Sequence, residues 1–532
     1  MTPRRAGGRR APLLLAVPAA VTAGAVLLPL VYLALRAAGA SREAWAILDA
    51  RTARLVLDTG ILVGSVVLMA LLIGVPLAWL VTRTDLPGRV FWAVAAALPL
   101  VIPSYVAALA LLGALGPRGL LQGILEGPLG VERLPEIYGL PGAVLALTLS
   151  TYPYVYLLAA AALREVDPAL EEAARGLGRS RWGVFRRVTL PALRPSVAAG
   201  SLLVALYVLS DFGAVSLMQY PALTRAIYLQ YEALFDRDPA AVLALVLVLL
   251  TALVLLGESR FRRRARYHRA TATAARRPQV VALGRWRWPA LAFCAAVVGA
   301  FLALPLAVLG WWTWEAIPLG RPIELAWRAA LNSALASAVA AAIAVAAALP
   351  VVFLSARHPA WWTRLLERAS FTANALPGIV IALALVFFGA RYAGPLYQTL
   401  ALLVFAYVVR FLPQALAASG SALRTVSPRY EEAARGLGRG QLAALWLVTA
   451  PLVRPGLLAG GALVFLSAMK ELPATLLLRP IGFETLATEI WTATSIAAYS
   501  QAAPSAFLLI AISAPFVWLL VGRRGAELAS PG

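Results

Sequence analysis

Apolar runs long enough to cross a membrane recur along the whole chain, and they limit its fold more than any other feature. A helix needs about 20 consecutive apolar residues to span the hydrocarbon core of a bilayer. We place twelve such runs at 12–36, 55–82, 90–115, 139–163, 192–218, 239–257, 289–312, 326–355, 368–390, 395–417, 452–478 and 501–522. The chain is 61% hydrophobic and only 14% charged, which excludes an ordinary soluble protein. The sequence therefore predicts an all-α integral membrane protein with about twelve transmembrane helices.

Arginine clusters predict the orientation of these helices, because short connections rich in Lys and Arg stay in the cytoplasm. The clusters occur in the N-terminal tail, in alternate connections and in the linker 258–288. The formal net charge of +22 is explained by this topology, so we expect no nucleic acid partner. Both termini are predicted to be cytoplasmic. A cleaved signal peptide is the alternative interpretation of the first apolar run.

An internal repeat organises the chain into two halves. The segment "LDTGILVGSVVLMALLIGVPLAWLVTR", which ends at Arg83, parallels "LNSALASAVAAAIAVAAALPVVFLSAR", which ends at Arg357. Pro76 matches Pro350 within these segments, at the same offset as Arg83 and Arg357. Two six-span halves that both enter from the cytoplasm are parallel repeats, related by an axis along the membrane normal.

The nine letters "EEAARGLGR" occur twice, at Glu171–Arg179 and at Glu431–Arg439. Each copy follows an N-cap residue and a proline, and each contains a glycine suited to end a helix. These residues are Asp167, Pro168 and Gly178 in the first copy and Ser427, Pro428 and Gly438 in the second. The pattern predicts a short capped helix on the cytoplasmic side in each half. A passive amphipathic helix on the lipid headgroups is the alternative for one copy, but it gives no reason for two identical ones.

Both copies resemble the EAA loop of ABC importer permeases, which has Glu-Ala-Ala, then Gly, then a β-branched residue and Leu-Pro. The first copy matches at Glu172, Ala173, Ala174, Gly178, Val188, Leu190 and Pro191, with Glu171 preceding the motif. The second matches at Glu432, Ala433, Ala434, Gly438, Val448 and Pro451, with Glu431 preceding it and Ala450 in place of Leu. The resemblance implies two repeats of the type I ABC importer permease fold in a bacterial inner membrane. It also implies that each loop is a coupling helix that docks on an ATPase.

That resemblance implies partners as well as a fold. Two coupling helices match two copies of a cytoplasmic ABC ATPase subunit, and an external binding protein delivers the cargo. The chain has no G-x-x-x-x-G-K-[ST] phosphate loop, so we expect no cofactor on this chain and ATP on the partner ATPase. The chain is accordingly predicted to be a transport subunit in contact with membrane lipid, and not an enzyme.

The repeats suggest boundaries along the chain, and prolines suggest breaks within spans. We expect kinks in the third and ninth spans at Pro99, Pro103 and Pro377. The predicted parts are a tail, first helix and external loop at 1–54, a first permease domain at 55–257, the linker at 258–288, a seventh helix and loop at 289–325, a second permease domain at 326–522 and a tail at 523–532.

Charged residues within the spans are candidates for the translocation pathway, because they are costly in a membrane. Asp211 falls in the fifth span, and Lys470 and Glu471 fall in the eleventh. The offset between Asp211 and Glu471 equals that between the two "EEAARGLGR" copies, so the acids are repeat-matched and would face each other between the halves. In the alternative, Lys470 neutralises Glu471 and Asp211 caps a helix end. Gly213 and Pro473 predict broken helices under either interpretation.

The segments "DFG", "KELPATLLLRP" and "GFETLATEIW" resemble the ferric iron importer group, so ferric iron is the expected cargo. Thiamine, polyamine and phosphonate importers have a similar layout and remain alternatives. A further alternative is an ion-gradient-driven secondary transporter with two six-helix halves. Neither the separated His268 and His358 nor the single Cys294 indicates a metal site. Tyr152, Tyr154 and Tyr156 are interpreted as aromatic packing in preference to iron ligands.

Overall fold

The computed structural model describes residues 13–116, 119–130, 134–232, 237–264, 280–316 and 324–529. Within these ranges, eleven helices are long and apolar enough to cross a membrane, and a bent pair makes a possible twelfth. The prediction of an all-α protein with about twelve transmembrane helices is confirmed. The arginines of the N-terminal tail, residues 265–279 of the linker and parts of the predicted loops lie outside the described residues.

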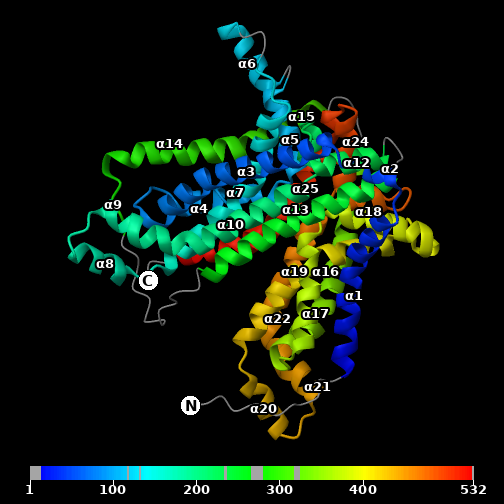
Figure 1. Ribbon diagram of the computed structural model, residues 1–532. Coiled ribbons are helices and arrows are strands. Elements are labelled where there is room, and N and C mark those ends of the chain that lie inside the picture. Colours follow the sequence, from blue (N-terminus) through cyan, green and yellow to red (C-terminus); the bar gives the residue numbers. More distant parts are fainter. Residues whose placement is uncertain are drawn as a thin grey trace. The chain divides into compact units, whose positions relative to one another are not determined.

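The helices group into two compact units (Figure 1). Unit 1 comprises Met1–Ser41 and Glu324–Thr488, and unit 2 comprises Arg42–Ile323 and Glu489–Gly532. Each unit therefore contains helices from both halves of the sequence. The boundaries drawn above follow the repeats along the chain, and they stay predictions.

Unit 1 is built around α16, α19 and α22, which pack against one another. Its elements are α1 (Leu13–Ala38), α16 (Glu324–Arg357), α17 (Trp361–Phe371), η6 (Thr372–Ala375), α18 (Gly378–Tyr392), η7 (Gly394–Leu396), α19 (Leu400–Thr425), α20 (Pro428–Gly436), α21 (Gln441–Ala444), η8 (Leu445–Thr449), α22 (Ala450–Met469) and α23 (Pro473–Leu478). The first helix of the chain, α1, packs on α16, α17 and α18. Its Tyr32 ring meets Phe388 edge-on at 5.5 Å, and its Arg36 guanidinium lies 5.0 Å from the centre of the Phe387 ring.

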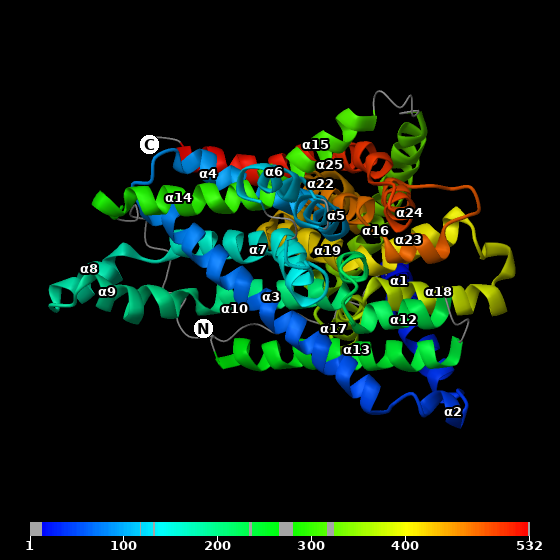
Figure 2. The same ribbon diagram turned by 90° about the horizontal axis from the view of Figure 1, so that it is seen from above.

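Unit 2 is built around α3, α7 and α10, the repeat-matched counterparts of α16, α19 and α22. Its elements are α2 (Arg42–Trp45), α3 (Ala50–Arg83), α4 (Arg89–Ala95), η1 (Leu98–Val101), α5 (Ser104–Leu115), α6 (Leu120–Leu129), α7 (Leu140–Glu165), α8 (Pro168–Gly176), α9 (Arg181–Val184), η2 (Phe185–Thr189), α10 (Leu190–Ser210), α11 (Gly213–Leu217), α12 (Leu223–Glu232), α13 (Arg237–Arg264), η3 (Gly284–Trp286), α14 (Arg287–Val298), η4 (Gly299–Ala303), α15 (Leu304–Ala316) and α25 (Tyr499–Ala529). Helix α24 (Leu486–Ser495) begins in unit 1 and ends in unit 2. Figure 2 shows α8 and α9 beyond one end of α7 and α10.

Prolines break the third and ninth spans, as the sequence predicts. The third span divides into α4, η1 and α5, with Pro103 directly before α5. In the ninth, the segment Trp361–Ala375 meets α18 at an angle of 104°, with Pro377 directly before α18. Both α5 and α18 are almost wholly buried, so each short helix after a proline break lies in the interior of the protein.

Candidate functional site

Helices α8 and α20 carry the two copies of the repeated segment, and both have the predicted caps. The Asp167 carboxylate accepts the Ala169 N–H at 2.9 Å, and Pro168 begins α8. Ser427 and Pro428 have the same roles in α20. Gly178 and Gly438 take φ angles of +78° and +84°, a left-handed conformation that favours glycine and ends the helix. The prediction of a short capped helix in each half is confirmed.

The two glutamates of each copy point in opposite directions. Glu171 is buried, with 7% of its surface exposed, whereas Glu172 and Ala173 beside it are exposed. Glu431 is half-buried, and Glu432 and Ala433 are exposed. Ala174 is half-buried and Ala434 is buried, so these alanines pack toward the protein. Each helix therefore has one face packed against the rest of the protein and one face exposed.

Large apolar side chains extend the open face of both helices. Leu177 is 83% exposed and its counterpart Leu437 is 85% exposed. Leu170 and its counterpart Tyr430 are also more than half exposed. Neighbouring exposed apolar side chains with polar residues around them are typical of an interaction surface. We call these two surfaces the docking faces: Leu170, Glu172, Ala173 and Leu177 on α8, and Tyr430, Glu432, Ala433 and Leu437 on α20.

A buried ion pair holds α8 to the end of α3. Arg83 Nη1 lies 3.3 Å from Glu171 Oε2, and the two side chains are only 4% and 9% exposed. Thr189 Oγ1 donates to Glu171 Oε1 at 2.8 Å, and Arg83 Nε donates to the Leu163 carbonyl at 3.0 Å. One carboxylate thus joins α8 to α3 and to the start of α10. We call Arg83, Glu171 and Thr189 the first coupling anchor.

The second half has the same arrangement at the end of α16. Arg357 Nε lies 3.0 Å from Glu431 Oε1, and Thr449 Oγ1 donates to the same oxygen at 3.0 Å. Arg357 Nη2 donates to the Val426 carbonyl at 3.0 Å. Each member occupies the repeat position of its counterpart in the first half. Arg357, Glu431 and Thr449 form the second coupling anchor.

The arginines and threonines of these anchors are functional candidates that the motif search missed. The sequence does hold a signal for the arginines, because the parallel segments of the repeat end on Arg83 and Arg357. Each threonine ends a π-helical turn, η2 or η8, a feature that often marks functional sites. The other motif residues start the next helix: Leu190 and Pro191 begin α10, and Pro451 is the second residue of α22, after Ala450.

The pathway candidate Asp211 lies at a helix break. Helix α10 ends at Ser210, and the Asp211 carboxylate accepts the Ala214 N–H at 3.0 Å at the start of α11. Its second oxygen accepts a hydrogen bond from Ser104 on α5. The Thr224 hydroxyl donates to the Asp211 carbonyl at 2.6 Å. The predicted break is present, and Asp211 caps the short helix that follows it.

The matched acid, Glu471, lies at the same kind of break between α22 and α23. Its carboxylate accepts the Ala474 N–H at 3.2 Å, so it caps α23 as Asp211 caps α11. Arg410 on α19 forms an ion pair with it at 3.2 Å. The sequence does not reveal this partner, because Lys470 is the basic residue next to Glu471 in the chain. Lys470 is the last residue before this acid. That Asp211 and Glu471 face each other stays a prediction, as does their contact with cargo.

The three tyrosines of α7 have packing partners. The Tyr152 and Phe301 rings lie 5.6 Å apart, the Tyr154 and Tyr207 rings lie 6.2 Å apart, and Tyr156 donates to the Ala93 carbonyl at 3.0 Å. Across the described residues, no three His, Cys, Asp or Glu side chains converge in a way that could hold a metal ion.

Comparisons with known proteins cover most of the chain. The family "Binding-protein-dependent transport system inner membrane component" matches residues 12–267 and 348–522. The Fe(3+)-transport system permease protein FbpB 2 of Haemophilus influenzae is 32% identical over 504 residues, 93% of this chain and 95% of that protein. The ferric transport system permease protein FbpB of Actinobacillus pleuropneumoniae is 23% identical over 74% of this chain and 60% of its own length. The molybdenum transport system permease protein ModB of Escherichia coli K12 is 36% identical over 28% of this chain and 63% of its own length.

The match covers both repeats, including both docking faces and both acids, and it agrees with the helical membrane fold. A multi-pass permease of this kind works with an ATPase and a substrate-binding protein. On these grounds, the chain belongs to the family of inner-membrane components of binding-protein-dependent transport systems, the permeases of ABC importers.

Proposed function

We propose that this chain is the permease subunit of an ATP-driven importer for ferric iron. Helices α8 and α20 each dock on one of two copies of a cytoplasmic ATPase subunit, which bind and hydrolyse the ATP. An external binding protein delivers the cargo to the opposite side. Both termini and both docking faces are on the cytoplasmic side of the membrane in this proposal.

The observation that carries the proposal is the difference between the two neighbouring acids in each of α8 and α20. In each helix, one acid is held inside by an arginine and the next acid is exposed beside an alanine and a leucine. Association with lipid headgroups alone would not require a buried ion pair on the opposite side of the helix. Each helix is thus fixed to the rest of the chain on one side and exposed on the other, so a protein bound to the exposed side can displace it.

The cargo follows from the length of the likeness to the Haemophilus protein, whose name gives Fe(3+) as its substrate. That likeness extends over 93% of this chain and 95% of the Haemophilus protein. The likeness to the molybdenum permease covers 28% of it, which is less than one full repeat. Ferric iron is therefore the cargo that the comparisons favour.

Charge reversal on the docking faces tests the coupling part of the proposal. We expect Glu172→Lys with Glu432→Lys to weaken ATPase binding about 100-fold or more, because two attractive contacts become repulsive. The measurement is co-purification and titration of the ATPase with the detergent-solubilised permease. Membrane insertion and thermal unfolding should not change, since both acids are exposed.

Glu165→Lys is the control, because Glu165 is an exposed acid at the end of α7 that lies off the docking face. It should leave ATPase affinity close to that of the wild type. Normal ATPase binding by the double variant, or equal losses in variant and control, would overturn the coupling proposal.

A further inference from the structure

Helices α3 and α16 are each held at two places, one at the end that carries the arginine and one in the third turn from the opposite end. At one end lie the coupling anchors, where Arg83 binds Glu171 and Arg357 binds Glu431. These are buried or nearly buried ion pairs, and separating a buried pair is strongly unfavourable. A displacement of α8 or α20 is therefore opposed by its arginine unless α3 or α16 moves with it.

At the far end of α3, a threonine hydroxyl holds the chain that follows Asp211. Thr59 Oγ1 accepts the Leu223 N–H at 3.1 Å and donates to the Leu55 carbonyl at 2.6 Å. Close by, Tyr220 donates its phenolic hydrogen to the Asp58 carbonyl at 2.8 Å. We call the bond between Thr59 and Leu223 the first far anchor.

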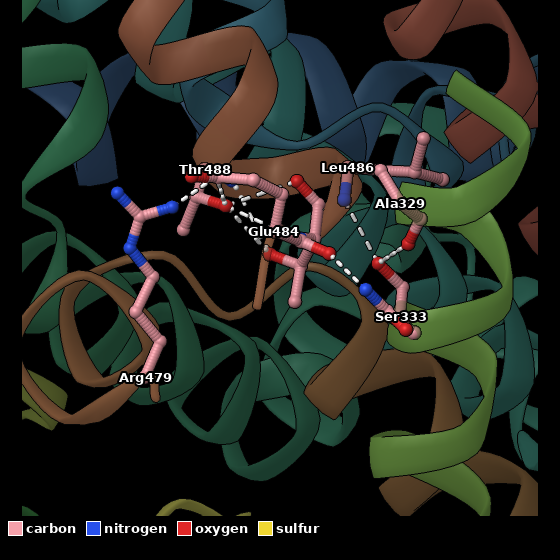
Figure 3. A network of polar contacts seen from close by, with 8 residues as sticks. Ala329, Ser333, Arg479, Glu484, Leu486 and Thr488 are labelled. Carbon is pink, nitrogen blue, oxygen red and sulfur yellow. Dashed lines mark hydrogen bonds and ion pairs between the residues drawn. The ribbon is translucent and has the colours of Figure 1, made fainter. Parts of the chain in front are cut away.

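At the far end of α16, a serine hydroxyl does the same for the chain that follows Glu471. Ser333 Oγ accepts the Leu486 N–H at 2.9 Å and donates to the Ala329 carbonyl at 2.8 Å, as Figure 3 shows. Asn332 Nδ2 donates to the Glu484 carbonyl at 2.9 Å. The Glu484 carboxylate accepts from Thr488 at 2.9 Å and pairs with Arg479, which orders the whole turn. The bond between Ser333 and Leu486 is the second far anchor.

The spacing of the anchors is the same in both repeats. Thr59 precedes Arg83 by as many positions as Ser333 precedes Arg357, since 83 − 59 equals 357 − 333. A helix of that length spans about 36 Å. Both α3 and α16 are continuous helices between their anchors. Most apolar positions differ between α3 and α16, whereas both anchor positions keep the same type of polar residue at the same spacing.

The far anchors hold the segments that carry the two acids. We call residues 211–224 and 471–488 the acid segments. The first is closed by the bond from the Thr224 hydroxyl to the Asp211 carbonyl. In the second, Thr475 donates to the Glu471 carbonyl at 2.5 Å. One helix in each half therefore touches the docking helix at one end and the acid segment at the other.

We propose that α3 and α16 are connecting helices, which transmit the displacement of each coupling helix to the acid segment at the far end of the same repeat. Arg83 and Arg357 are positioning residues at the coupling anchors, and Thr59 and Ser333 are positioning residues at the far anchors. The inference rests on the proposed function, in which α8 and α20 are moved by an ATPase.

The test compares hydroxyl removal with hydroxyl exchange at the far anchors. The hydroxyl-removal variant, Thr59→Val with Ser333→Ala, removes both hydroxyls with little change in side-chain shape. The hydroxyl-exchange variant, Thr59→Ser with Ser333→Thr, gives each repeat the residue of the other and keeps both hydroxyls. Each is prepared with the ATPase bound, and amide hydrogen exchange is followed with and without ATP and vanadate. The readouts are the acid segments, residues 211–224 and 471–488, and the helices α8 and α20.

In the wild type and in the hydroxyl-exchange variant, we expect trapping to change exchange both at α8 and α20 and at the acid segments. In the hydroxyl-removal variant, we expect the change at α8 and α20 to persist while the change at the acid segments falls about tenfold, since each lost buried hydrogen bond is worth roughly that factor. Cargo transported per ATP hydrolysed should fall in parallel.

Charge exchange tests the other end. Arg83→Glu alone should reduce the response at residues 211–224 while α8 still responds to the ATPase, and Arg83→Glu with Glu171→Arg should recover part of the response at residues 211–224. The connecting-helix inference is overturned if the hydroxyl-removal variant shows the full wild-type response at the acid segments. Failure of the proposed function gives a different result: in that case, ATPase and nucleotide do not change amide hydrogen exchange at α8 and α20 even in the wild type.

Discussion

At the scale of single residues, the two repeats use the same positions for different polar groups. In the first repeat, the short Asp211 is held by the Ser104 hydroxyl. In the second, the longer Glu471 is held by the Arg410 guanidinium. The matched residues are Ser104, Ser150 and Asp211 in one repeat and Gly378, Arg410 and Glu471 in the other. A Cβ on Gly378 would overlap Arg410 Nη1, so the glycine makes room for the arginine.

Gly378→Ser tests whether these three residues act as a set. We expect it to destabilise the protein by about 2 kcal/mol, because the new side chain would displace the ion pair of Arg410 and Glu471. Adding Arg410→Ser and Glu471→Asp converts the set to that of the first repeat and should recover most of the loss. The measurement is thermal unfolding of the purified protein in detergent. A triple variant less stable than Gly378→Ser alone would show that the sets are not interchangeable.

At the scale of the element, the shape of α8 and of α20 depends on how each helix ends. The left-handed Gly178 turns the chain back, so that the Arg179 N–H reaches the Ala174 carbonyl at 3.2 Å. The matched bond in the second copy joins the Arg439 N–H to the Ala434 carbonyl, also at 3.2 Å. This turn sets the direction in which Leu177 and Leu437 project from the docking faces.

Gly178→Ala should therefore weaken ATPase binding about tenfold, because a left-handed alanine is disfavoured by roughly 1 to 2 kcal/mol. Gly176→Ala is the matched control: Gly176 is the last residue of α8 and has nothing within 4 Å of an added Cβ. An alanine there should leave binding unchanged or slightly improved, since alanine favours helix. Titration of the ATPase against each variant measures the difference. Equal affinities for both variants would contradict this role for the turn.

At the scale of the whole molecule, the two compact units do not coincide with the two repeats. Unit 1 contains α1 together with helices of the second repeat, and unit 2 contains α14, α15 and α25 together with helices of the first. Neither repeat supplies a complete unit by itself. Helices from both halves of the sequence are therefore needed to complete each unit.

We expect the external binding protein that serves this permease to bind ferric iron, and the reconstituted permease and ATPase to take up iron when that protein is loaded. Binding titrations with ferric iron, molybdate and thiamine make the comparison, followed by uptake of radiolabelled iron into proteoliposomes. Molybdate is the informative competitor, because a molybdenum permease matches part of this chain. Tight binding of molybdate or thiamine in place of iron would contradict the proposed cargo.

The sequence predicts those features of this fold that depend on local signals. Hydropathy locates the spans, and Asp167, Pro168 and Gly178 define both ends of α8 because caps act on adjacent backbone groups. The ion pair of Arg83 and Glu171 joins residues 88 positions apart, so no local pattern reveals it. For Glu471, proximity in sequence points to Lys470, whereas the folded chain supplies Arg410 from α19.

The place of α1 in unit 1 has a consequence for how the protein is made. Helix α1 ends at Ala38, whereas the first of its partners, α16, begins only at Glu324, so more than half of the chain is synthesised between them. At about 5 to 20 residues per second, synthesis leaves α1 without these partners for roughly 15 to 60 s. Helix α1 is strongly apolar and stays mostly exposed even in the finished protein, which suits a helix that is surrounded by lipid until these partners are made. Helix α1 can therefore pack into unit 1 only after α16, α17 and α18 have been synthesised.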